Sequence, residues 1–154
     1  MINRFEEEYV FYSYATDDLR EAFNYLKSIN LYKRKLTISA LIQIAIIAYS
    51  RPFKKCIGNY GRHKIEDTMI PNKFSSLHKK IITYRDSIFA HSDISIRKPT
   101  LSRKKIENKT VFSMTYRGFK PDDFRHDVNN MKKLIEALSL SLRLRREELK
   151  LKMT

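Results

Sequence analysis

Glycine, proline and cysteine are scarce in this sequence. Its 154 residues include three glycines, four prolines and one cysteine, Cys56. All-β folds need many tight turns, and tight turns use glycine and proline, so the composition favours helices. A single cysteine excludes an internal disulfide and a metal site built from several cysteines.

Long hydrophobic runs are also missing. The most apolar stretch, residues 38–49, is interrupted by Ser39 and Gln43 and is shorter than the roughly 20 residues of a membrane-spanning helix. The acidic first eight residues differ from a signal peptide. We therefore expect a cytoplasmic protein without a membrane partner, in which residues 38–49 form a buried helix. The length and the 42% hydrophobic content predict one domain over residues 1–154.

Negative charge is in short supply. Lysine and arginine number 31 against 17 aspartates and glutamates, which gives a net charge of +14. Such a field attracts polyanions, so nucleic acid is the expected partner. The alternative is a source whose proteins are generally basic.

Helical periodicity is clear in the first third of the chain. A helix is predicted from about residue 3 to residue 29, with a capping box formed by Asn3 and Glu6. Alternatively, residues 16–18 cap a second helix, so that two helices lie end to end. The expected apolar positions are Phe5, Tyr9, Tyr12, Leu19, Phe23 and Leu26.

Two further helices are predicted in the middle of the chain. One covers about residues 35–50 and ends at Arg51-Pro52, since a proline disfavours the helical conformation of the residue before it. Residues 52–72 are predicted to be a long loop. The next helix begins after Asn72 and reaches about His91, and its apolar stripe consists of Phe74, Leu77, Ile81, Tyr84 and Ile88.

The last third of the chain combines a hairpin and a helix. Residues 94–118 predict a small basic β-hairpin, with 111–116 as the clearer strand. This hairpin either contacts nucleic acid or is simply a solvated surface element. A final helix is expected from Pro121, with a charged end that frays. Its heptad seam consists of Phe124, Val128, Met131, Ile135, Leu138 and Leu142.

Together these elements predict an all-α fold. We expect a four- to five-helix up-and-down bundle with a small β-hairpin inserted before the last helix. The heptad seam is expected to be core, or alternatively a surface for a partner protein.

One short motif carries the functional prediction. In YRDSIFAHSD, residues 84–93, Arg85 and Asp86 are adjacent, and His91 follows five residues after the aspartate. Arg85 and His91 are separated by about 240° on an ideal helix, so they do not share one face. They come together if the helix ends near His91, or if two copies of the motif face each other in a dimer.

The segment from Arg85 to His91 resembles the signature of the HEPN superfamily (higher eukaryotes and prokaryotes nucleotide-binding domains). That signature is an arginine, a polar neighbour and a histidine four to six residues after the arginine. The string RDSIFAHSD and the preceding AYSRPF are similar to abortive-infection and other defence-associated bacterial members. The resemblance covers these two short segments. The predicted helices make it compatible with about the whole chain.

The resemblance implies a homodimeric, metal-independent endoribonuclease, a toxin or phage-defence effector that needs no cofactor. His91 would assist attack of the 2′-hydroxyl or protonate the leaving oxygen, because its pKa is near neutrality. Arg85 would neutralise phosphate oxygens, and Asp86 would orient one of the two. The products would be a 2′,3′-cyclic phosphate and a 5′-hydroxyl. An antitoxin or sensor protein is the further partner implied.

Neighbouring residues complete the expected site. Arg51, Tyr84, Ser92 and Asp93 are candidates for substrate binding, and no metal ligands are expected. Asp93 stands where antitoxin-paired HEPN toxins often have a tyrosine that a partner nucleotidyltransferase modifies, so that form of neutralisation is not expected here.

Structural roles compete with these assignments. Arg85 would instead pair with Asp86 or another neighbour, His91 would cap a helix, and Arg51 would be a solvated charge at a helix end. The remaining histidines are predicted to lie at the surface: His63, His78 and His126.

Two other functions fit the same composition. A non-catalytic HEPN module would bind nucleotide or RNA within a defence assembly, and would show salt-sensitive binding without cleavage. A helical interaction protein would use the heptad seam as a partner surface and would not bind RNA.

Overall fold

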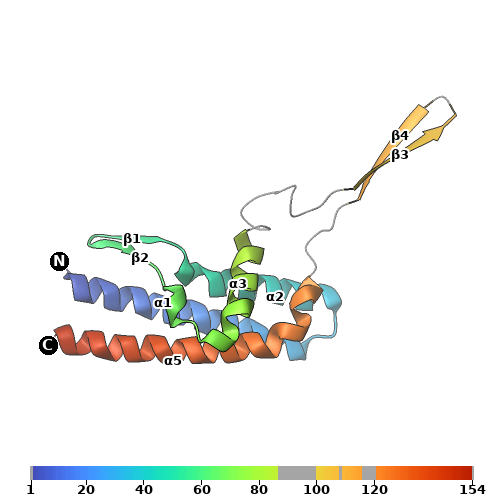
Figure 1. Ribbon diagram of the computed structural model, residues 1–154. Coiled ribbons are helices and arrows are strands. Elements are labelled where there is room, and N and C mark those ends of the chain that lie inside the picture. Colours follow the sequence, from blue (N-terminus) through green and yellow to red (C-terminus); the bar gives the residue numbers. More distant parts are fainter. Residues whose placement is uncertain (1, 87–99, 108, 116–120, 154) are drawn as a thin grey trace.

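A computed structural model describes residues 2–86, 100–107, 109–115 and 121–153 of the chain. This part is mostly helical, with four α-helices and two small antiparallel hairpins. The helices are α1 (Arg4–Ser28), α2 (Lys35–Ser50), α3 (Ser75–Arg85) and α5 (Val128–Met153). Helices α1 and α5 lie side by side, with both chain termini at one end, whereas α3 runs across them (Figure 1).

The first helix is a single element, so the alternative of two helices end to end is wrong. Asn3 caps it as predicted: its side chain accepts hydrogen bonds from the backbone N–H of Phe5 and Glu6, at 2.9 and 3.0 Å. The Glu6 carboxylate accepts the Asn3 backbone N–H in return, at 2.6 Å. This capping box fixes where the chain enters α1.

The hydrophobic core lies between α1, α2, α3 and α5. Its largest fully buried side chains come from every one of these helices and from the turns between them: Leu19, Leu26, Ile42, Ile46, Tyr49, Ile65, Ile81, Phe124, Met131, Leu134, Leu138 and Leu142. The seam of α5 is therefore core, as predicted, and its use as a surface for a partner is wrong. Only Leu19 and Leu26 of the predicted α1 stripe are fully buried. The other buried apolar positions of α1 are Phe11, Ala15 and Ala22, which the predicted stripe did not include.

Helix α2 is the most apolar element. Together with η2 (Arg51–Phe53), its segment Lys35–Phe53 is long and apolar enough to cross a membrane by length and composition alone. Tyr49, Ala45 and Ile46 of this segment are fully buried within the protein. A core helix of this kind passes the same test, so the segment gives only weak evidence of a membrane span.

Residues 52–72, predicted to be a loop, contain a hairpin. Strand β1 (Cys56–Gly58) pairs with β2 (Gly61–His63), and Ile57 lies opposite Arg62. Short 3₁₀ turns follow at η3 (Asp67–Met69) and η4 (Asn72–Phe74). Strands of three residues are too short to show the alternation that identifies a strand in a sequence.

The second hairpin is confirmed. Strand β3 (Thr100–Ile106) pairs with β4 (Lys109–Thr115), with Thr100 opposite Thr115 and Ile106 opposite Lys109. The chain then forms the 3₁₀ segment η6 (Pro121–Asp127) before α5 begins at Val128. The predicted start of the last helix at Pro121 is thus seven residues too early.

The charged end of α5 does not fray, which corrects the prediction. Leu149 is fully buried there, and the helix continues to Met153. Two arginines join this end to α1: Arg145 bonds to Glu8 at 2.7 Å, and Arg146 bonds to the hydroxyl of Tyr9 at 3.1 Å.

Candidate functional site

Arg85 and Asp86, the first two residues of the segment that resembles the HEPN signature, lie at the end of α3. Arg85 is its last residue, and the backbone N–H of Asp86 bonds to the carbonyls of Ile82 and Thr83. The Arg85 Nη1 atom donates to Asp86 Oδ1 at 2.9 Å. This pairing is the structural alternative that the sequence offered for the arginine, and it fixes the direction of the guanidinium.

Lys54 joins this pair, although the sequence did not single it out. Its Nζ atom lies 2.7 Å from Asp86 Oδ2 and 2.6 Å from Oδ1. Two cations from different parts of the chain therefore share one carboxylate. The only sequence signal for Lys54 was its place in a basic pair, Lys54-Lys55, after Arg51-Pro52-Phe53.

An aromatic cluster positions Lys54. Phe53 of η2 packs against Tyr49 of α2, with ring centroids 5.2 Å apart, and against His78 of α3 at 4.5 Å. A hydrogen bond of 2.8 Å joins Tyr49 Oη to His78 Nδ1. Lys54 follows Phe53 directly, so this cluster holds its backbone beside the end of α3.

His78 is buried, which corrects its prediction as a surface residue. Burial lowers its pKa below the usual value, and the nearby Asp67 carboxylate opposes that shift. Burial also raises the pKa of Tyr49 far above its usual range. The tyrosine hydroxyl is thus protonated. The Asp67 carboxylate, which can only accept, lies 3.4 Å from His78 Nε2, so we assign the proton of the neutral ring to Nε2 and the role of acceptor from the Tyr49 hydroxyl to Nδ1.

The cluster of Lys54, Arg85 and Asp86, here called the α3-end cluster, carries a net charge of +1. Partial burial opposes ionisation of Asp86, but hydrogen bonds from Lys54 and Arg85 outweigh it and lower the pKa of the carboxyl. The exposed fractions of the three side chains are 37%, 33% and 42%, respectively. Solvent-accessible donors with excess positive charge suit a phosphate.

Two other predicted site residues, Arg51 and Tyr84, make their described contacts outside this cluster. Arg51 bonds to α1 instead, through Asp18 at 3.0 Å and Glu21 at 2.6 Å. Tyr84 packs edge-on against Phe124, with centroids 4.7 Å apart. His91, Ser92 and Asp93 lie outside the described residues.

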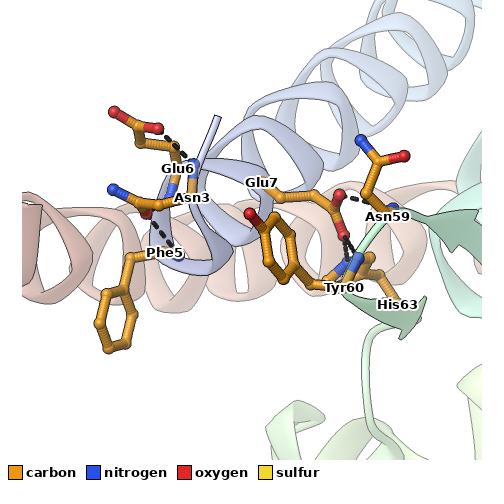
Figure 2. Close-up of polar contacts among 7 residues, drawn as sticks. All are labelled: Asn3, Phe5, Glu6, Glu7, Asn59, Tyr60 and His63. Atoms are coloured by element: carbon orange, nitrogen blue, oxygen red, sulfur yellow. Dashed lines mark hydrogen bonds and ion pairs between the residues drawn. The ribbon is translucent and has the colours of Figure 1, made fainter. Parts of the chain in front are cut away.

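A second polar cluster joins α1 to the β1–β2 hairpin (Figure 2). The Glu7 carboxylate accepts the backbone N–H of Asn59 at 2.6 Å and of Tyr60 at 3.0 Å, and it contacts His63 Nε2 at 2.7 Å. The hydrogen bond from His63 lowers the pKa of Glu7. His63 is mostly buried in this contact, so its prediction as a surface residue is also wrong, whereas His126 is exposed as predicted.

Glycine is required next to this cluster. A Cβ atom at Gly58 would collide with the Glu7 carboxylate. A cleft of about 300 Å³ opens beside it, lined by Glu7, His63, Arg51 and Cys56, among others. Because the carboxylate already accepts three hydrogen bonds, we interpret Glu7 as a tether for the hairpin and not as a catalytic base.

Metal-binding potential is limited in the described ranges. Within residues 2–86, 100–107, 109–115 and 121–153, no three side chains from histidine, cysteine, aspartate and glutamate are grouped to hold an ion. The α3-end cluster contributes one carboxylate and two cations, a set that repels metal ions.

No family model, curated protein or solved structure matches this chain. The HEPN resemblance therefore stays a prediction from the motif that begins at Arg85.

Proposed function

We propose that the protein is a metal-independent endoribonuclease of the HEPN type, a toxin or phage-defence effector. It cuts RNA to 2′,3′-cyclic phosphate and 5′-hydroxyl ends in the cleft of a homodimer. The observation that supports this proposal best is the α3-end cluster, which holds Arg85 and Lys54 at the start of the motif that leads to His91.

Each residue has a defined chemical role. Arg85 and Lys54 bind the phosphate oxygens, and their charge stabilises the additional negative charge of the transition state. His91 transfers a proton to or from the reacting oxygens at cellular pH. Asp86 orients both cations, and it cannot neutralise both.

The proposed function also requires a particular fold and assembly. Helices α1, α2 and α5 form the up-and-down part of the bundle, which the contacts of α1 with α2 and with α5 support, and α3 crosses it. Two copies bring their motifs together around a two-fold axis. The protein works in the cytoplasm and needs no cofactor, with an antitoxin or sensor protein as a further partner.

A non-catalytic RNA-binding module is the second candidate. The observation that favours it is that Asp86 already pairs with both cations of the α3-end cluster. In such a module the cluster would be a structural ion triad, and phosphate contacts would come from elsewhere on the basic surface.

The test compares four proteins: wild type, His91→Ala, Lys54→Gln and the control Lys55→Gln. Lys55 is the exposed neighbour of Lys54, and the two substitutions remove the same charge. Each protein is incubated with total RNA in EDTA, followed by analysis of the RNA ends. We expect wild type and Lys55→Gln to leave cyclic phosphates and His91→Ala to be inactive.

Lys54→Gln is expected to slow cleavage by about 10- to 100-fold, the usual range for one hydrogen bond to a charged group. Cleavage that requires a divalent metal would refute the proposed mechanism. Salt-sensitive RNA binding without cleavage by any of the four proteins would leave two readings, the non-catalytic module and an enzyme that awaits its trigger. Sedimentation as a monomer at micromolar concentration would refute the dimer.

A further inference from the structure

The β3–β4 hairpin stands away from the helices (Figure 1). All fourteen residues of its two strands are exposed. Its turn begins at Glu107, which has a positive φ of 52°. An isolated two-stranded hairpin is only marginally stable in water, so a ligand that covers one of its faces would stabilise it.

One face of the hairpin combines an aromatic ring with cations. Side chains alternate between the two faces of a strand, so Arg103 and Lys105 share a face with Phe112 of the opposite strand. The Arg103 guanidinium lies 5.6 Å from the centroid of the Phe112 ring. Phe112 is nevertheless 59% exposed, beside the equally open Met114.

The charge of the hairpin selects among ligands. Its described residues include four cations (Arg103, Lys104, Lys105 and Lys109) and one carboxylate, Glu107, for a net charge of +3. A second copy of this chain would bring like charge against like charge. A polyanion is complementary to the hairpin and to the +14 of the whole chain.

The distribution of side chains distinguishes a nucleic acid from a membrane. A segment that lies on a membrane separates its apolar face from its charged face. Here Lys104 and Lys109 lie on the face opposite Phe112, and Arg103 and Lys105 lie beside it. Intermixed cations and an exposed aromatic ring are instead the features of surfaces that bind single-stranded nucleic acid.

We propose that the β3–β4 hairpin is an arm that binds single-stranded RNA. Phe112 stacks on a base, while Arg103 and Lys105, about 7 Å apart along one strand, contact the phosphates. The choice of RNA over DNA rests on the proposed function. The arm would hold the substrate strand independently of the α3-end cluster.

Binding is measured by fluorescence anisotropy with a labelled 2′-O-methyl oligouridylate. This probe lacks the nucleophilic 2′-hydroxyl, so its binding does not depend on cleavage. The full chain is compared with Phe112→Leu, Phe112→Tyr and the double variant Arg103→Gln/Lys105→Gln. The matched control is Lys133→Gln/Arg143→Gln, which removes two exposed charges from α5.

We expect Phe112→Leu to weaken binding at least about fivefold and Phe112→Tyr to retain it, because a ring is needed for stacking. The hairpin double variant should reduce the slope of log affinity against log salt by about 1.4, since each phosphate contact on a single strand contributes about 0.7. The α5 control should neither weaken binding as much as Phe112→Leu nor reduce the salt slope as much as the hairpin double variant.

Two results would overturn the inference. One is a hairpin double variant that behaves like the α5 control. The other is equal competition by polyglutamate or by phosphatidylglycerol vesicles, which would assign the arm to an acidic protein or to a membrane. If wild type cleaves total RNA while the hairpin variants bind normally, only this inference fails. If the arm binds the probe but no RNA is cut, only the ribonuclease proposal fails.

Discussion

Removal of one buried hydroxyl tests the aromatic cluster beneath the α3-end cluster. In Tyr49→Phe the ring remains, so its packing against Phe53 is retained and only the hydrogen bond to His78 is lost. The Tyr49 and His78 side chains are 0% and 4% exposed, and their bond measures 2.8 Å. The substitution therefore leaves His78 Nδ1 without its donor in a buried position.

An unsatisfied buried acceptor costs about 1–3 kcal/mol of unfolding free energy. For a chain of about 150 residues, a loss near 2 kcal/mol lowers Tm by about 4–8 °C. The matched control is Tyr25→Phe, which removes a partly buried hydroxyl that donates to Glu21 within α1, at 3.0 Å. We expect the control to unfold at the same urea concentration as wild type.

The pH dependence provides a second test of the same bond. Burial lowers the pKa of His78 below its usual 6.5, so the unfolded chain takes up a proton at a higher pH than the folded one. Stability is therefore complete above 6.5 and is lost as the pH falls toward the lower folded value. The Tyr49 hydroxyl favours the neutral ring, so its removal raises the folded pKa and weakens this acid sensitivity.

Urea unfolding followed by circular dichroism, at about pH 7.5 and about pH 5, measures both effects. We expect a clear deficit of Tyr49→Phe at the higher pH and a smaller one at the lower. An unchanged midpoint at the higher pH would refute the role of the bond. A deficit that grows on acidification would refute donation from the Tyr49 hydroxyl to the neutral His78 ring.

Three further predictions concern the last turns of α5 and the contact between Glu7 and the β1–β2 hairpin. Leu149→Ala should lower the unfolding free energy by about 2–5 kcal/mol, whereas Leu151→Ala, at a position that is 80% exposed, should change it by less than about 0.5 kcal/mol; equal effects in urea would show that α5 frays. Gly58→Ala should displace Glu7 and speed hydrogen exchange at the amides of Asn59 and Tyr60, and unchanged exchange at both would contradict the tether. Hydrogen bonding to His63 lowers the pKa of Glu7 below 4.5. Protection of these two amides should therefore be complete above pH 4.5 and lost as the pH falls through the Glu7 pKa of the folded protein. Protection that persists in Glu7→Gln would contradict this.

Local signals predicted the long elements well. The capping box at Asn3, the stop at Arg51-Pro52 and the period of α5 depend on residues close in sequence, and each of these predictions is confirmed. The β1–β2 hairpin was missed because its anchor, Glu7, lies about fifty residues away. A contact of that range leaves no pattern in one sequence.

The candidate site shows the same division. Arg85 and Asp86 could be found because the motif is contiguous, and their pairing was foreseen as an alternative. Lys54 could not be found, since its contact with Asp86 spans 32 positions and depends on how Phe53 packs between Tyr49 and His78. His63 and His78 were misjudged for a related reason: charged neighbours in sequence suggested exposure, while tertiary contacts bury both rings.

The excess positive charge is unevenly organised over the described residues. On the helical body, several cations meet nearby carboxylates: Arg51 bonds to Asp18 and Glu21, and Arg145 bonds to Glu8 and Glu148. The α3-end cluster shares one carboxylate between two cations, and the β3–β4 hairpin has four cations for one. Uncompensated charge repels itself and destabilises a fold, so neither place gains stability from its excess of cations. The two proposals require Lys54→Gln to slow RNA cleavage and Arg103→Gln/Lys105→Gln to weaken RNA binding, in each case without lowering the free energy of unfolding.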